Sequence, residues 1–260
     1  MFEAAALRAL VLSFFAGMST LLGALIIFVM NKKSEKLVTI SLGFAGGVMI
    51  SVSFTDLLPN ANALLTQYGG YRFGILSEVF FLLAGVVIAG LLDRFVPHEP
   101  EENGDGKVHE NLFRVGFVST MAIGLHNFPE GIATFMAGYE DMALGMSIAA
   151  AIAMHNIPEG ISVAMPIYFA TGNKMKALKY TFLSGIAEPL GALLAFFVLK
   201  PFISDLTLGI IFALISGVML YIAIEELIPS SRQYGYSKEA LSATFMGIAL
   251  MPLSGLFGAV

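Results

Sequence analysis

The chain has 260 residues, of which 57% are apolar and 13% are charged. Soluble domains carry about 25% charged residues, and a soluble globule of this length could not bury so much apolar surface. The composition excludes a soluble enzyme, and the excess of 19 acidic over 14 basic residues excludes a nucleic-acid-binding protein. With no Cys, disulfide frameworks, Fe–S clusters and thiolate metal sites are excluded as well. The remaining class is an all-α polytopic membrane protein.

Eight stretches are long and apolar enough to cross a bilayer, which takes about 20 residues. In chain order they cover residues 5–29, 37–58, 75–95, 113–137, 142–169, 175–199, 206–229 and 239–259. Short connections and one polar loop at 96–112 make up the rest, so we expect a single transmembrane domain over 1–260. The N-terminus has no basic segment before its apolar stretch, and we expect that stretch to remain in the membrane rather than to be a cleaved signal.

Lys and Arg are unevenly distributed between the two ends of these spans. If the N-terminus lies outside, all of the 14 basic residues except Arg8, Arg72 and Lys200 fall on the inside. Basic loops are enriched on the cytoplasmic side of membranes. The distribution predicts a multi-pass protein of the plasma (inner) membrane with both termini outside and the 96–112 loop in the cytoplasm.

The two ends of the chain resemble each other. Residues 47–59 (GVMISVSFTDLLP) match residues 217–229 (GVMLYIAIEELIP), and an acidic residue and a proline stand in register. Counterparts that are five spans apart cross the bilayer in opposite directions, and such inverted repeats are typical of transporters. The alternative is chance similarity among apolar helices, against which the acid and the proline in register argue.

A second repeat is closer: HNFPEGI at 126–132 and HNIPEGI at 155–161. Each motif lies about 14 residues from the polar turn around Glu140, which is roughly 20 Å along a helix and near the middle of a core about 30 Å thick. His126 and Glu130 are spaced i, i+4, as are His155 and Glu159, so each pair shares one helix face. Two antiparallel helices therefore present the same two ligand types at one depth.

Three acidic residues, Glu130, Glu159 and Glu188, lie at membrane depth, and no Lys or Arg is predicted near them. Charges in a membrane cost roughly 3 kcal/mol or more each and mark ion pathways. Two imidazoles favour Zn, Fe, Mn or Co over Mg or Ca, and Asn127 and Asn156 add amide oxygens. A carboxylate that bridges two ions would allow a binuclear site, so the sequence is compatible with either one or two bound metal ions. An isolated buried His or Glu could be a structural hydrogen-bonding group, but two matched copies favour a metal site.

For the other candidate metal-binding residues, a purely structural role is at least as well supported by the sequence. Asp56 near the outer end of the second span, and Glu225 and Glu226 near the inner end of the seventh, could attract and release cations or be interfacial caps. In the polar loop, His98 and His109 could bind metal or be merely solvated. Methionines near the motifs could form a soft Cu(I) path, although Met is ordinary packing material in apolar helices: Met121, Met136, Met146, Met154 and Met165.

The two motifs, together with SLGFAGG at 41–47, HNFPEGIATF at 126–135 and GIAE at 185–188, resemble the ZIP family of divalent metal transporters, most closely its bacterial ZupT type. The resemblance implies a 3+2+3 arrangement, with an inverted repeat of helices 1–3 and 6–8 and a binuclear site on helices 4, 5 and 6. One ion would be held by His126, Glu130, His155 and Glu159, and the other by Asn127, Asn156, Glu159 and Glu188, so that Glu159 bridges the two ions and Glu130 could bridge them as well. Some relatives have Gln-Asp where this chain has His155 and Asn156, which leaves one acid fewer here.

The expected function is uptake of a divalent transition metal into the cytoplasm by alternating access. The resemblance to the ZIP family implies that helices 1, 4, 5 and 6 move relative to helices 2, 3, 7 and 8 during transport. Zinc and iron are the expected cargo, with manganese, cobalt and cadmium as further candidates. We expect no cofactor, no enzymatic activity and no nucleic acid, with the metal ion, the bilayer and a second copy of the chain as partners. His-Glu-x-x-His is absent, which argues against a metalloprotease, and four His are too few for a His-rich membrane oxygenase. A channel or a proton-coupled carrier of another substrate remains an alternative.

Overall fold

The computed structural model describes residues 4–29, 34–95, 107–199 and 204–254. Across these residues every regular element is a helix and no strand occurs, as the sequence predicted. The helical elements before the first motif are α1 (Ala4–Ala24), α2 (Ile26–Val29), α3 (Glu35–Val52), η1 (Ser53–Leu57), α4 (Leu58–Gly69) and α5 (Tyr71–Phe95). Here α denotes an α-helix and η a π-helix.

The two motif copies lie inside the longest helices of the described chain, α6 (Lys107–Glu140) and α7 (Met142–Thr171), which meet at Asp141 as predicted. Residues 107–112, which were expected to belong to the polar loop, are instead the first turns of α6. His109 lies in these turns, and His98 lies outside the described residues. The remaining elements are α8 (Lys174–Gly185), α9 (Ala187–Leu194), η2 (Ala195–Leu199), α10 (Asp205–Tyr221), η3 (Ile222–Leu227), α11 (Ile228–Ser231) and α12 (Ser237–Ser254).

Several helix ends follow from local sequence. Ser34 and Asn173 cap α3 and α8 by accepting a hydrogen bond from the backbone N–H three residues on. Ser204 and Thr207 form a reciprocal capping box at the start of α10. Gly70, with a φ of 83°, ends α4, because this left-handed conformation is readily adopted only by glycine.

Six helical stretches of the described chain are long and apolar enough to cross a membrane. They are Ala4–Val29, Glu35–Gly69, Tyr71–Leu91, Ile148–Thr171, Lys174–Val198 and Asp205–Ser231, and each overlaps one predicted span. The other two predicted spans, 113–137 and 239–259, fall on α6 and α12. Their described residues are helical, although neither helix is among the six, and residues 255–259 of the last span lie outside the described residues.

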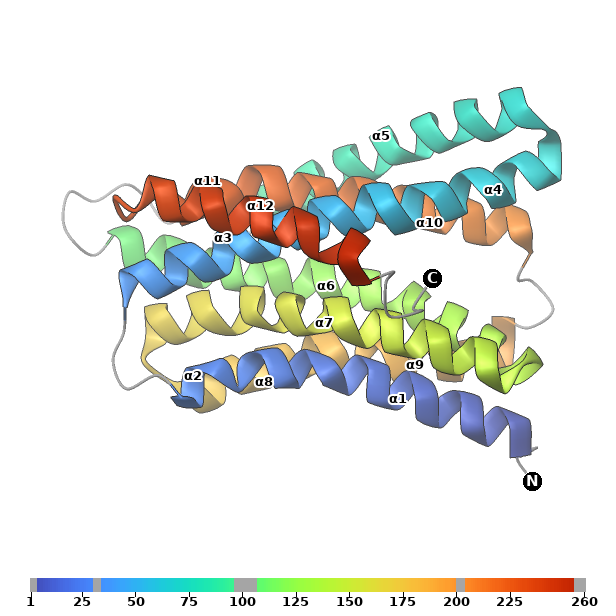
Figure 1. The fold of residues 1–260 in the computed structure, drawn as a ribbon, viewed down its shortest axis with the longest axis horizontal. Coiled ribbons are helices and arrows are strands. Elements are labelled where there is room, and N and C mark those ends of the chain that lie inside the picture. The colour runs from blue at the N-terminus through green and yellow to red at the C-terminus, as the bar shows by residue number, and fades with distance from the viewer. Residues whose placement is uncertain (1–3, 30–33, 96–106, 200–203, 255–260) are drawn as a thin grey trace.

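The helices pack in two groups (Figure 1). The first helix group is α1, α6, α7, α8 and α9, whose members pack mainly on one another. The second helix group is α3, α4, α5, α10, α11 and α12 with the π-helices η1 and η3, in which α3 packs along α12 and α5 along α10. Contact between α3 and α7 is the main junction of the two groups. In Figure 1, α6 and α7 lie in the middle of the bundle, between the rest of the first group and the second group.

The resemblance between the two ends of the chain extends to an unusual local structure. Both matching segments are π-helical, η1 at Ser53–Leu57 and η3 at Ile222–Leu227, and each carries acidic side chains. Each is followed by an α-helix with proline in its first turn, Pro59 in α4 and Pro229 in α11. Single-turn π-helices occur frequently at functional sites. The internal repeat in the sequence identified these two segments as counterparts but did not predict their π-helical form.

Candidate metal site

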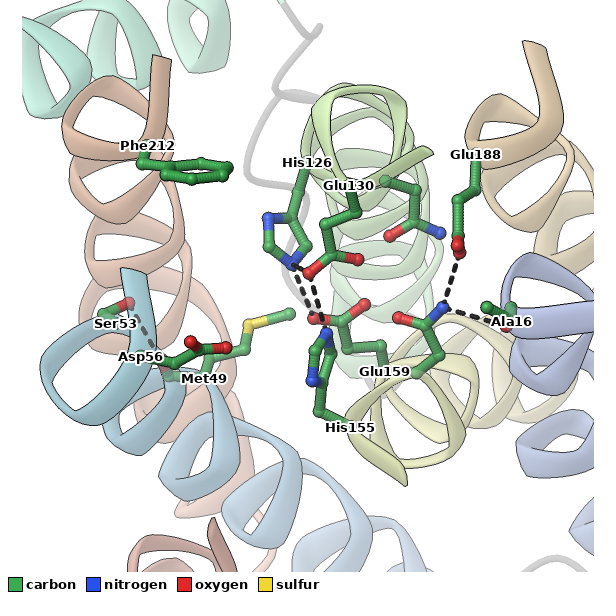
Figure 2. A network of polar contacts seen from close by, with 12 residues as sticks. Ala16, Met49, Ser53, Asp56, His126, Glu130, His155, Glu159, Glu188 and Phe212 are labelled. Atoms are coloured by element: carbon green, nitrogen blue, oxygen red, sulfur yellow. Dashed lines mark hydrogen bonds and ion pairs between the residues drawn. The ribbon is translucent and has the colours of Figure 1, made fainter. Parts of the chain in front are cut away.

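Four side chains of the two motifs meet between α6 and α7 (Figure 2). Oε1 of Glu130 lies 2.7 Å from Nε2 of His155 and 3.0 Å from Nε2 of His126. Oε1 of Glu159 lies 3.5 Å from Nε2 of His126. All four residues are at most 4% exposed. The structure thus brings together, across two helices, the ligand types that the sequence placed at equal depth.

The spacing of these atoms suits a metal ion. One ligand atom from each of His126, Glu130 and His155 lies within 4.8 Å of the others. Zinc binds imidazole nitrogen and carboxylate oxygen at about 2.0–2.2 Å, so a single ion can reach ligand atoms this far apart after small side-chain movements. Mixed nitrogen and oxygen ligands suit Zn, Fe, Mn and Co, whereas Mg and Ca favour oxygen alone. The arrangement can therefore hold a transition metal out of contact with water.

The two motif asparagines point their amide groups outward from the α6–α7 pair. Asn127 Nδ2 donates to the Ser184 carbonyl oxygen at 3.2 Å, and Asn156 Nδ2 donates to the Ala16 carbonyl oxygen at 3.1 Å and to Glu188 Oε2 at 3.0 Å. Within the described chain, Oδ1 of both asparagines and Oε1 of Glu188 are buried without a hydrogen-bond partner. Buried acceptors without a partner are costly. Three further buried oxygens beside the His/Glu group therefore have no hydrogen-bond donor among the described residues.

The glycine of each motif brings a neighbouring helix close to the site. A Cβ atom on Gly131 would overlap the carbonyl oxygen of Glu188, so α9 can approach α6 only because that residue is glycine. In the same way, a Cβ atom on Gly160 would overlap the carbonyl oxygen of Thr20 in α1. The motif sequence thus supplies both the ligands and the close packing that places Glu188, which is fully buried, beside them.

The second helix group faces the site from the opposite side. In Figure 2, Asp56 of η1, Met49 of α3 and Phe212 of α10 lie across from His126 and His155. Asp56 also accepts a hydrogen bond from Asn60 Nδ2 at 2.8 Å. The sequence singled out Asp56 but missed Met49, which is 1% exposed and belongs to the GVM segment of the repeat.

The acidic residues near the end of the seventh predicted span lie away from these ligands, on η3. Glu225 is exposed, whereas Glu226 is buried and pairs with Arg114 of α6 through Oε1 and Nη1 at 3.0 Å. Two of the methionines considered for a Cu(I) path, Met121 and Met146, are 42% and 52% exposed and so lie largely on the outer surface of the bundle. The structure gives these methionines no common path to the site.

Known proteins resemble this chain in sequence over most of their length. The sequence model of the family described as ZIP Zinc transporter matches residues 97–255. A protein named Zinc transporter ZupT from Oceanobacillus iheyensis is 42% identical over 95% of this chain and 97% of its own length. Proteins of the same name from Streptococcus mutans and Clostridium perfringens are 40% and 39% identical, each over 95% of this chain and at least 95% of their own length.

These matches span both motifs and the helices that surround them. Members of this family are membrane transporters rather than enzymes. The match in sequence thus agrees with the apolar helices and the buried His/Glu group. The chain belongs to the ZIP family of membrane transporters.

Proposed function

We propose that this protein takes up divalent transition metals into the cytoplasm, with zinc as the main cargo and iron, manganese, cobalt and cadmium as further cargo. The single observation that carries the proposal is the buried group of His126, Glu130, His155 and Glu159. Related proteins named zinc transporters support zinc as the cargo. Intramembrane ionisable groups facing a bundle interior mark ion pathways.

The site is proposed to be binuclear. The first ion would be held by His126, Glu130, His155 and Glu159. The second would be held by Asn127, Asn156, Glu159 and Glu188, so that Glu159 bridges the two ions. The buried acceptor oxygens of Asn127, Asn156 and Glu188 that lack a partner in the described chain support this second position.

Transport is proposed to proceed by alternating access in a molecule of eight spans, arranged 3+2+3 with inverted repeats. The site ligands all belong to the first helix group, and the second helix group closes the site from the other side. Movement of the first group against the second would expose the ligands to each side of the membrane in turn. Asp56, which faces the site, would guide the cation on the outer side.

The proposed location is the inner membrane, with both termini outside and the basic loops in the cytoplasm. In that orientation, an inside-negative potential of 100 mV favours entry of a divalent cation by about 4.6 kcal/mol. This energy suffices to drive uptake without a nucleotide or another cofactor. Association of two copies remains a further prediction, which mass measurement of the purified protein in detergent would test.

Uptake into proteoliposomes that contain a metal-sensitive dye tests the proposal. Purified protein should admit Zn²⁺ with a rate that saturates, and His126→Ala or Glu159→Gln should abolish uptake. Glu239→Gln is the matched control, since Glu239 is partly exposed and pairs with the exposed Lys36. If Zn²⁺, Fe²⁺, Mn²⁺ and Co²⁺ all fail to enter, or if the site variants transport as well as the parent protein, the proposal is wrong. A rate that stays linear with concentration would indicate a channel.

A further inference from the structure

A buried ion cluster joins three helical segments away from the metal site. The guanidinium of Arg114 in α6 pairs with Glu226 of η3 at 3.0 Å and with Asp93 of α5. Asp93 also accepts a hydrogen bond from the Tyr221 hydroxyl of α10 at 3.3 Å. Arg114 precedes His126 by twelve residues, so it lies about 18 Å from that histidine along the same helix.

Burial makes this cluster different from an ordinary surface ion pair. The side chains of Arg114, Asp93 and Glu226 are 14%, 13% and 6% exposed. Arginine stays protonated in proteins, and a buried pair that loses one partner leaves an uncompensated charge behind. The cluster therefore favours arrangements in which the guanidinium and the two carboxylates remain together.

The cluster also crosses the boundary between the two helix groups. Arg114 belongs to the first helix group with all the site ligands, whereas Asp93 and Glu226 belong to the second. Another ion pair of the described chain, Lys36 with Glu239 at 3.0 Å, joins α3 to α12 within the second group and is 52% and 35% exposed. If the two helix groups move apart near the start of α6, the Arg114 cluster must break, whereas the Lys36–Glu239 pair can stay intact.

The face of α6 that carries His126 is closed on the side of the site toward the start of the helix. Ser119 lies two turns before His126 on the same face, is fully buried, and has no hydrogen-bond partner for its hydroxyl among the described residues. Val115 and Ile123 on that face are also buried, each 1% exposed. Arg114 lies about 120° around α6 from His126, so the cluster is beside this closed face rather than on it, near the start of α6 and the end of α5, which the distribution of Lys and Arg places on the inside.

We propose that Arg114 is a latch between the two helix groups, and that its separation from Asp93 and Glu226 opens the metal site toward the cytoplasm. The proposal rests on the transport function proposed above, because it assigns a role in that movement. Arg114 acts as a positioning residue: it does not touch the metal, but it biases the protein toward the form in which the inner route is closed. Weakening the latch should raise the population of the form that is open to the inside.

Cysteine labelling tests this directly, since the chain has no Cys of its own. Ser119→Cys places a nearly isosteric thiol on the closed face, and a membrane-impermeant maleimide is added to the basic-loop side of membrane vesicles. In this background Arg114→Gln and Glu226→Gln should each raise the labelling rate by roughly tenfold or more, because the first leaves two buried carboxylates without their cation and the second removes one of the two carboxylates that hold the guanidinium. Lys36→Gln is the matched control and should leave the rate unchanged.

The charge-swapped protein, with Arg114→Glu and Glu226→Arg, separates a latch from simple packing. It should label more slowly than either single variant, because a guanidinium and a carboxylate again face each other between positions 114 and 226, whereas a loss of packing would not be restored. The near-isosteric Glu226→Gln keeps the test valid if Arg114→Gln does not fold. If neither single variant labels faster than the Lys36→Gln control, the latch is refuted. Labelling needs no transported metal, so it is independent of whether the uptake assay succeeds.

Discussion

One oxygen of Glu130 lies 2.7 Å from Nε2 of His155 and 3.0 Å from Nε2 of His126, so a single carboxylate on α6 joins the imidazoles of both motifs. This residue is the centre of the proposed first ion position. A cation between the two imidazoles would neutralise this buried carboxylate. Burial of such a charge is costly unless it is paired or binds a metal.

Glu130→Gln should weaken zinc binding by roughly tenfold or more, because the amide keeps the size of the side chain but removes its charge. Isothermal titration of the purified protein in detergent measures the affinity. Glu239→Gln serves as the control, since it removes an equal charge at a partly exposed position. Equal affinities for the parent and Glu130→Gln would remove Glu130 from the site.

Glu188→Gln should eliminate one of two bound ions and leave the other in place. Glu188 is the acidic ligand that belongs to the second proposed position alone, whereas the first position uses His126, Glu130, His155 and Glu159. Elemental analysis after equilibrium dialysis against zinc should give two ions per chain for the parent and one for the variant. One ion per chain in the parent protein would contradict the binuclear site.

Gly131→Ala should destabilise the protein by about 1–3 kcal/mol, because the added methyl group would overlap the Glu188 carbonyl and force α9 away from α6. Gly124→Ala on the same helix is the matched control, as a Cβ atom there would meet nothing closer than 3.9 Å. Thermal unfolding in detergent compares the two. Equal unfolding temperatures would show that the close approach of α9 is not required.

Much of this fold was readable because apolar length and the i, i+4 spacing are properties of the sequence itself. All eight predicted ranges are helical over their described residues apart from single turn residues at Leu25 and Ile186, and the turn at Asp141 lies between the two motifs as expected. The pairing of His126 and Glu130 with His155 and Glu159 followed from equal distances to that turn. Membership of the ZIP family, expected from the motifs, is confirmed.

Other features depend on contacts that hydropathy does not report. The second predicted span ended at residue 58, but the helical segment continues to Gly69. In this added part, Asn62 forms hydrogen bonds with Glu78 of α5 and with Thr66 one turn further along. Polar residues there lowered the hydropathy without ending the helix. The π-helical form of η1 and η3 was also hidden, because a continuous apolar pattern does not distinguish i+5 from i+4 bonding. The Arg114 cluster joins residues more than 100 positions apart, which no local pattern reveals.

The central claim is that the cargo binds at His126, Glu130, His155 and Glu159. Anomalous scattering measured at the zinc edge from zinc-soaked crystals of the protein tests this claim most directly. We predict an anomalous peak about 2.0–2.2 Å from Nε2 of both His126 and His155 and from a carboxylate oxygen of Glu130. A zinc peak elsewhere in the bundle, with none between these two histidines, would contradict the account.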